Sequence, residues 1–196
     1  MLEHGTHDIP AGKVAVIVTY LEMTSRVATK DIAAPQGVTF QRIKPTLEEY
    51  RDLFQRVGAH DWLWYGRLRL SDTELQALLD DPKRPIYTLM KDGRSEALLE
   101  LDFTTQGACE LAYFGLTPEL IGSGAGRYLM NHAIAAAWGA GVSRFHLHTC
   151  THDSPQALEF YLRSGFTVYK RKVDIDDDPR LLGLLPRDAA PRIAIL

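Results

Sequence analysis

Apolar side chains recur along the chain with two periods, and each period predicts one kind of element. The β-branched and apolar run from Val14 to Met23 predicts a strand, and Val38 to Ile43 alternates as a second strand. A loop from Thr24 to Gln36 separates them. The first part of the chain is therefore expected to form strands rather than helices.

Two capping boxes predict the starts of the first two helices. One begins at Thr46, ahead of apolar side chains at helical spacing, and its helix is expected to end at Gly58. The other begins at Ser71, and Pro82 is expected to end the shorter helix behind it.

Three antiparallel strands are expected after the helices. Ile86 to Met90 and Glu96 to Phe103 flank an Asp-Gly pair at residues 92–93, which is typical of a hairpin turn. A second turn at residues 106–107 leads into a half-buried strand from Glu110 to Leu116.

Four more elements follow this central strand. Apolar side chains at helical spacing from Leu129 to Trp138 predict a helix, and Arg144 to Thr149 predicts a strand. Pro155 to Ser164 is expected to form a helix with Ser154 as its cap, and Phe166 to Val173 a last strand.

The segments outside these elements are expected to be irregular. Met1 to Gly12 is polar and predicts a flexible arm, while Asp174 to Pro179 predicts an acidic turn. The tail from Leu181 to Leu196 has two apolar clusters separated by prolines, which leaves open packing on the domain or on a partner chain in a homodimer. Residues 1–196 are therefore expected to form one domain with a variable tail over residues 174–196.

Composition narrows the class of protein. Of 196 residues, 45% are hydrophobic and 24% are charged, which is ordinary for a soluble domain with a sizeable core. A net charge of -3, with no basic cluster beyond residues 170–172, argues against a nucleic-acid surface. Two cysteines without Cys-x-x-Cys spacing give no disulfide scaffold or zinc site. Without a leader or a membrane-spanning run, the expected location is cytoplasmic, with no membrane partner.

Three glycines stand at alternate positions just before the central helix. Gly122, Gly124 and Gly126 let the backbone approach a ligand, and the helix start offers unpaired N–H groups, so a phosphate or pyrophosphate site is predicted. The loop lacks the Gly-Lys-Ser/Thr of a Walker motif and the G-x-G-x-x-G spacing of a dinucleotide fingerprint.

Two motifs in the expected order resemble those of the GNAT acyltransferase superfamily. Ile121 to Gly126 resembles the Arg/Gln-x-x-Gly-x-Gly/Ala loop that binds acetyl-CoA, with Ile121 in place of Arg/Gln. Ser154 to Phe166 resembles an Asn-x-x-Ala-x-x-x-Tyr-x-x-x-Gly-Phe element, with Ser154 in place of Asn. Together the motifs cover about Glu110 to Phe166.

The resemblance implies an α/β (α+β) GNAT fold, in which a mixed, mostly antiparallel central sheet is flanked by helices. It implies an N-acetyltransferase that moves an acetyl group from acetyl-CoA to a primary amine of a small molecule or peptide, and it leaves a longer acyl donor open. The implied cofactor-binding residues are the strand end, the glycine loop and the cap of the next helix: Phe114, Gly115, Leu116, Ile121, Gly122, Ser123, Gly124, Ala125, Gly126, Arg127 and Ser154.

Two catalytic roles follow from the same resemblance. Tyr161 matches the acid that protonates the CoA thiolate, and the competing interpretation is a core aromatic. Glu110 is the candidate base, expected to share a face with Ala112 and Phe114 and to have its pKa raised by partial burial. Glu100, a water molecule or a plain surface role for Glu110 remain alternatives.

Two further groups of residues were weighed. Trp62 to Tyr65 either wall an acceptor pocket or fill the core. His146, His148 and His152 lack a Cys or carboxylate at ligand spacing, so no metal is expected. The alternative class of protein is a non-catalytic acyl-CoA-binding module on the same fold, which the departures at Ile121 and Ser154 favour and the retained Tyr161 opposes.

Overall fold

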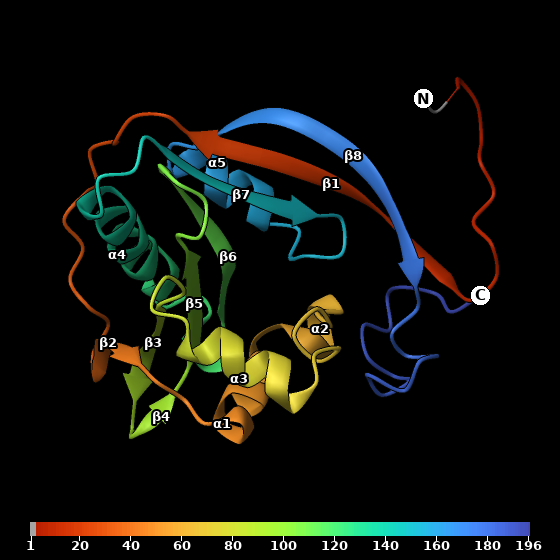
Figure 1. The fold of residues 1–196 in the computed structure, drawn as a ribbon, viewed down its shortest axis with the longest axis horizontal. Coiled ribbons are helices and arrows are strands. Elements are labelled where there is room, and N and C mark those ends of the chain that lie inside the picture. The colour runs from red at the N-terminus through yellow and green to blue at the C-terminus, as the bar shows by residue number, and fades with distance from the viewer. Residues whose placement is uncertain (1–2) are drawn as a thin grey trace.

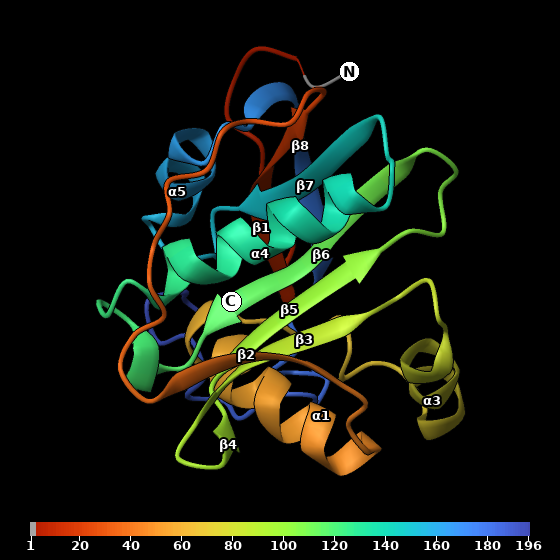
Figure 2. The same cartoon turned by 90° about the vertical axis from the view of Figure 1, so that its left-hand side faces the viewer.

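The computed structural model describes residues 3–196, in which a mixed sheet carries helices on both faces (Figures 1 and 2). The predicted arm from Met1 to Gly12 therefore begins outside the described residues. The strands are β1 (Lys13–Met23), β2 (Val38–Ile43), β3 (Ile86–Lys91), β4 (Arg94–Ser95), β5 (Ala97–Asp102), β6 (Ala108–Leu116), β7 (Arg144–Cys150) and β8 (Thr167–Asp177). The helices are α1 (Leu47–Phe54), α2 (His60–Trp62), α3 (Asp72–Asp80), α4 (Ala125–Gly139) and α5 (Ala157–Arg163), with a π-helical segment at Gln55–Ala59 and a 3₁₀ turn at Pro118–Leu120.

The sheet is antiparallel except at its centre. Its strand order is β2-β3-β5-β6-β7-β1-β8, with the short β4 paired to β3. Strands β6 and β7 run parallel and pair only from Ala108 to Glu110 and from Arg144 to His146. Beyond these residues the two strands diverge, as Figure 1 shows, and a gap opens in the middle of the sheet. The expected mixed, mostly antiparallel sheet is confirmed.

Each face of the sheet has its own core because side chains alternate along the strands. Leu99 and Leu101 of β5 pack on one face with the apolar side chains of α4. Leu98 packs on the opposite face with the apolar side chains of α1 and α3. Figure 2 shows α4 lying across one face and α1 beneath the other. No helix within residues 3–196 is long and apolar enough to cross a bilayer.

Strand β1 lies far from β2, the strand that follows it in the sequence. It is inserted between β7 and β8 and pairs with both in antiparallel orientation. Val18 faces Cys150 on one side and Lys172 on the other. In Figure 1, β1 and β8 form a long ribbon that extends beyond the rest of the sheet. The sequence pattern correctly predicts this strand but does not identify its partners.

The predicted end of the first helix at Gly58 is wrong. Helical structure continues through the π-helical segment to Trp62. The glycine serves packing instead, because a Cβ at Gly58 would lie 2.1 Å from the ring of Trp64. Both capping boxes are confirmed, since the side chains of Thr46 and Ser71 accept from the backbone three residues on.

Two boundaries near the C-terminus also differ from the prediction. The acidic turn expected from Asp174 is wrong in its first half, because β8 continues to Asp177 and Ile175 pairs with Ala15 of β1. Helix α5 begins at Ala157 rather than at residue 155, so Ser154 is not its N-cap. The Ser154 hydroxyl accepts instead from the N–H of Gln156 at 3.4 Å, inside the turn that precedes the helix.

The tail packs back on the domain. Leu185 and Ala189 are buried in the same core as α1 and α3. A buried ion pair between Asp178 and Arg180 fixes the start of the tail, with Nη2 and Oδ2 2.7 Å apart. Arg180 Nη1 also donates to the carbonyl oxygens of Ala189 and Ile193, at 3.1 and 2.7 Å. One guanidinium therefore ties the tail to the end of β8.

Candidate active site

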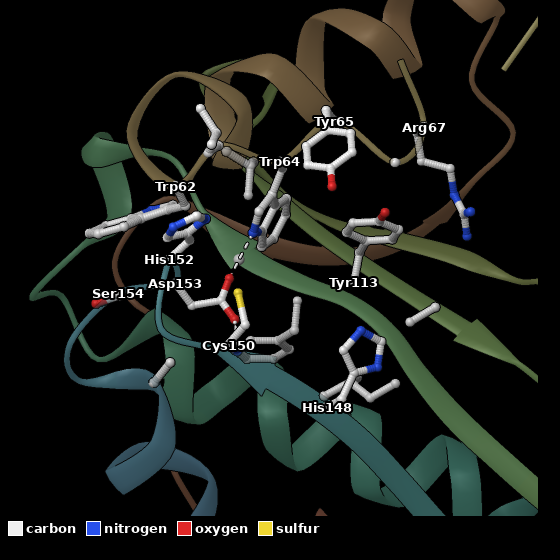
Figure 3. A pocket seen from close by; sticks show the side chains of 18 of the residues that line it. Trp62, Trp64, Tyr65, Arg67, Tyr113, His148, Cys150, His152, Asp153 and Ser154 are labelled. Carbon is white, nitrogen blue, oxygen red and sulfur yellow. Dashed lines mark hydrogen bonds between the residues drawn. The ribbon is translucent and has the colours of Figure 1, made fainter. Parts of the chain in front are cut away.

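A cavity of about 960 Å³ lies where β6 and β7 diverge. Its lining includes the strand Glu110 to Leu116, the loop residues Gly122 and Gly126, and the aromatic stretch from Trp62 to Tyr65. Figure 3 shows side chains from the helical region and from β7 turned toward one another across this space. Segments that are far apart in the sequence thus meet at the break in the sheet.

The glycine loop has a backbone that other residues adopt only with strain. Gly122 and Gly124 have φ of 81° and 87°, in the left-handed region that favours glycine. A Cβ at either position would meet nothing within 4 Å, so the space beside the loop is open. Between them, Ser123 donates its hydroxyl to Leu120 and accepts from the N–H of Ala125.

Three backbone donors of this loop remain free. The N–H groups of Gly122, Gly124 and Gly126 donate to no acceptor among residues 3–196, and no side chain caps α4. The N–H of Arg127 is already taken by the carbonyl of Gly124 at 3.1 Å. The start of α4 and the turn before it therefore carry three free N–H groups and the partial positive charge of the helix beside a cavity that Gly122 and Gly126 line. This is the chemistry that binds an anion.

The side chains around the loop point to other partners. Ile121 is 62% exposed, and its apolar side chain offers no hydrogen-bonding group to a ligand. The guanidinium of Arg127 donates to the Ser164 hydroxyl at 2.9 Å and stacks on Phe160. The Arg127 charge thus lies beside Phe160 of the cavity lining, and Arg163 also lines the cavity, so side chains and backbone N–H groups both contribute positive charge.

The edge of β6 that faces the cavity is unpaired beyond Glu110 in the described chain. Phe114 and Leu116 pack toward α4. Gly115 faces the other way, and a Cβ there would lie 2.4 Å from Val57. Glycine at this position therefore makes room for packing, while the strand edge stays open to a ligand.

Glu110 and His148 form a pair inside the cavity. Glu110 Oε1 lies 3.4 Å from His148 Nδ1, and their side chains are 34% and 50% exposed. The hydrogen bond to His148 lowers the pKa of Glu110, and the same bond raises the pKa of His148. The expectation that burial raises the pKa of Glu110 is therefore wrong, because the imidazole stabilises the carboxylate more than burial destabilises it.

The expected face of Glu110 is also wrong. Leu101 pairs with Leu111 but Glu100 pairs with Tyr113, so Ala112 is an extra residue that forms a β-bulge. A bulge reverses the alternation of side chains along the strand. Glu110 consequently shares a face with Tyr113 rather than with Phe114.

Glu100, the alternative base, is engaged in the core. It is fully buried and accepts from the Tyr50 hydroxyl at 2.7 Å. Arg67 donates to the same carboxylate and completes a buried ion pair. Because Tyr50 and Arg67 both bind its carboxylate inside the core, Glu100 has a structural role.

Tyr161 lies on α5 and reaches the cavity wall. Only 8% of the residue is exposed, and its ring packs against Phe114 and Phe166. Burial raises the pKa of its hydroxyl, with the charge of Asp153 adding to the effect. Its hydroxyl donates to no acceptor among residues 3–196, so the proton stays on the oxygen and is not shared in a hydrogen bond. Packing and acid chemistry are compatible at this position.

Sequence reasoning missed two residues of the site, His148 as the partner of Glu110 and Asp153. The Asp153 carboxylate accepts from Trp64 Nε1 at 2.9 Å, from the Thr149 hydroxyl at 2.7 Å and from the N–H of Cys150 at 2.8 Å (Figure 3). It thereby ties the aromatic stretch to the end of β7. The signal that could have identified Asp153 is its position just after a strand and before Ser-Pro, where an aspartate commonly forms a turn.

The aromatic stretch both fills core and lines the cavity. Leu63 is buried and Trp64 packs on Gly58, as core residues do. Trp64 and Tyr65 also line the cavity, and the Tyr65 hydroxyl donates to Asp176 at 2.8 Å. Within residues 3–196, no three His, Cys, Asp or Glu side chains gather in the geometry of a metal site.

Strands β6 and β7 run parallel and diverge beside the glycine-rich start of α4, in a sheet that is otherwise antiparallel. Residues 44–166 match the profile described as "Acetyltransferase (GNAT) family". The chain belongs to this family.

Individual relatives are more distant. Over 184 residues the chain is 24% identical to a mycothiol acetyltransferase of Jonesia denitrificans, covering 91% of the chain and 58% of that protein. A GCN5-related N-acetyltransferase of Sphaerobacter thermophilus superposes with a TM-score of 0.63 at 15% identity, over 88% of the chain and 53% of that structure. An aminoglycoside acetyltransferase from an uncultured soil sample gives 0.56 at 14% identity, over 70% and 93%. The chain thus spans little more than half the length of the first two, and the structural likenesses concern the fold.

Proposed function

We propose that the chain transfers an acetyl group from acetyl-CoA to a primary amine of a small molecule or a peptide. The observation that carries the proposal is that one cavity brings together an anion-binding helix start, a Glu-His pair and an unshared tyrosine hydroxyl. Membership of the acetyltransferase family supports the same reaction.

Acetyl-CoA fits the donor side as a substrate. The free N–H groups of Gly122, Gly124 and Gly126 suit its pyrophosphate, and the open space beside them admits it. The unpaired edge of β6 from Phe114 to Leu116 offers backbone groups to the amides of the pantetheine arm, as to an added strand. Ser154 and Ile121 complete this part of the lining.

The reaction removes two protons from the ammonium form of the acceptor and adds one proton to the departing CoA sulfur. Glu110, kept ionised by His148, takes a proton from the ammonium form of the acceptor directly or through a water. The neutral amine then forms a C–N bond at the carbonyl carbon while the C–S bond breaks and its electron pair leaves on the CoA sulfur, and the new amide nitrogen loses its remaining extra proton to solvent. Tyr161 donates its hydroxyl proton to that thiolate and regains one from solvent.

The acceptor side of the cavity suits a cationic amine. Trp62, Trp64 and Tyr65 supply aromatic faces, which attract ammonium groups. Among the carboxylates of the lining, Asp102 and Asp176 are paired with Arg84 and Arg69. The carboxylates left to attract an ammonium group are those without an arginine partner in the described chain: Glu110, Asp153 and Asp174.

A binding module without catalysis is the second candidate function, favoured by the exposed Ile121 at the position where the family has Arg or Gln. Calorimetry with acetyl-CoA and a thiol-release assay over a panel of amines separate the two. Binding together with amine-dependent release of CoA supports the acetyltransferase. Binding without release for any amine supports the module, and absence of binding contradicts both.

A further inference from the structure

The outer edge of β8 has no partner strand within residues 3–196. This strand ends the sheet and pairs only with β1. Its residues are exposed from Thr167 to Ile175. Ile17, Val173 and Ile175 are 49%, 48% and 48% exposed, and the pairing of Ile17 with Val173 gathers them on one face of the ribbon. A long exposed edge of this kind is a template for another strand.

The basic and acidic residues of β8 are ordered so that two antiparallel copies of the strand complement each other in charge. Lys170, Arg171 and Lys172 precede Val173, and Asp174 and Asp176 follow it. In an antiparallel pair of two identical strands, one strand's basic half faces the other's acidic half. The edge therefore carries the charge pattern of its own partner.

Geometry selects one register. In an antiparallel pair, residues directly opposite each other point to the same face of the sheet. A two-fold axis perpendicular to the sheet therefore passes between the two copies of one residue and not between two successive residues. An axis at Val173 places Lys172 opposite Asp174 of the second copy, with valine facing valine at the centre. An axis at Lys172 sets two lysines face to face at the centre, and an axis at Asp174 sets two aspartates there, which is destabilising. The second of these registers would also pair Lys172 with Asp176 and Arg171 with Asp177, but Arg69 and Lys13 already bind those two carboxylates. The axis at Val173 is the one of the three that has no like-charge pair at its centre.

We propose that a second copy of this chain pairs antiparallel with the edge of β8, with the two-fold axis at Val173, and continues the sheet across a dimer. Asp174 lines the cavity, so Lys172 of the second copy comes to the rim of the neighbouring site. Asp176 already binds Tyr65 and Arg69, which makes the Lys172–Asp174 pair, present twice, the main electrostatic contact. The proposal is independent of the acetyl-transfer reaction.

A charge swap tests it by sedimentation equilibrium. The wild-type chain is expected to dimerise reversibly. Lys172→Glu and Asp174→Lys should each weaken the dimer on the order of tenfold or more, since each turns two attractions into two repulsions. The double variant should regain most of the affinity because both pairs re-form with the signs exchanged. Lys30→Glu and Asp31→Lys change the charge equally at exposed positions outside β8 and should leave the dimer unchanged.

The outcomes are distinct because both residues are exposed and neither holds the core together. A monomeric wild type at all concentrations overturns the proposal. So does a dimer that both single variants leave intact, or a double variant that stays as weak as the single ones.

Discussion

Glu110 and His148 shift each other's pKa in opposite directions, and the signs define a pH window. The lowered pKa of Glu110 adds stability that is present above its unfolded value and is lost as pH falls. The raised pKa of His148 adds stability that is present below its unfolded value and is lost as pH rises. The ion pair therefore persists between the two pKa values, although both side chains are too exposed for it to contribute much to folding.

Glu110→Gln keeps the shape of the side chain and removes its basicity. The rate should fall most near neutral pH and recover as pH rises, because more of the acceptor amine is then already neutral. The measurement is kcat by thiol release as a function of pH, with the surface variant Glu48→Gln as control. A pH–rate profile identical to that of the wild type would show that Glu110 is not the base and would favour water in that role.

His148→Gln removes the main cause of the low pKa of Glu110. The pKa of Glu110 should rise, and the acidic limb of the pH–rate profile should move to higher pH. Carbon NMR of the labelled glutamate side chains measures this directly, and His60→Gln on the surface provides the matched control. An unchanged Glu110 titration means that the pair does not form in solution.

Tyr161→Phe removes one hydroxyl from a side chain whose ring is packed. Turnover should drop roughly 10- to 1,000-fold, while the affinity for acetyl-CoA and the melting temperature stay close to wild type. Steady-state kinetics measure the drop. Tyr87→Phe, on a ring that stacks on Phe40 outside the cavity, should not change the rate. Wild-type turnover in the Tyr161 variant would reduce the residue to a packing role.

Among the elements, features that depend on neighbouring residues in the sequence were predicted correctly, and features that depend on contact between distant segments were not. The capping boxes at Thr46 and Ser71 are confirmed because a cap is a contact between residues three apart. The bulge at Ala112 depends on how β5 meets β6, so a single strand pattern cannot reveal it. That one residue reversed the predicted face of Glu110. The extension of β8 to Asp177 likewise depends on β1, which pairs with it along its whole length.

The helix start of α4 allows charge and backbone strain to be separated. Gly124→Ala strains a left-handed φ at a cost of about 1 kcal/mol but adds no charge and no clash. Gly124→Glu adds the same strain and a carboxylate where the pyrophosphate is proposed to bind. Calorimetry should show a small loss of acetyl-CoA affinity for Ala and a loss of at least about tenfold for Glu. Equal affinities of the two variants would show that no anion binds there.

For the molecule as a whole, the sequence predicted the family and the mixed, mostly antiparallel sheet correctly. It did not predict that Asp153 and His148 would face Trp64 and Glu110 across the gap in the sheet. These residues lie on segments that only the tertiary fold brings together. Contacts across the gap between β6 and β7 produce no periodic pattern in the sequence of either strand.

The buried pair of Asp178 and Arg180 anchors the tail and predicts a loss of stability. Arg180→Met should lower the free energy of unfolding by about 3 kcal/mol, since the carboxylate is left buried and unpaired and tail carbonyls lose their donor. Urea unfolding followed by circular dichroism measures the loss, with exposed Arg26→Met as control. Arg180 lowers the pKa of Asp178, so the pair's contribution is present above pH about 4 and is lost below it. An unchanged unfolding midpoint would show that the tail adds no stability.

Because β1 is inserted between β7 and β8, strands from the two ends of the chain lie side by side and close a long stretch of chain into a loop. The N–H of Ile17 donates to the hydroxyl of Thr151, 134 residues away, and the Thr167 hydroxyl donates to Glu22, 145 residues away. Such distant contacts form late, because the loop must close before they contribute any stabilisation. A break in the exposed loop at residues 24–37 would leave β1 held only by its hydrogen bonds and its buried side chains, such as Leu21 and Met23, so that one strand of the sheet becomes exchangeable with a free peptide of the same sequence.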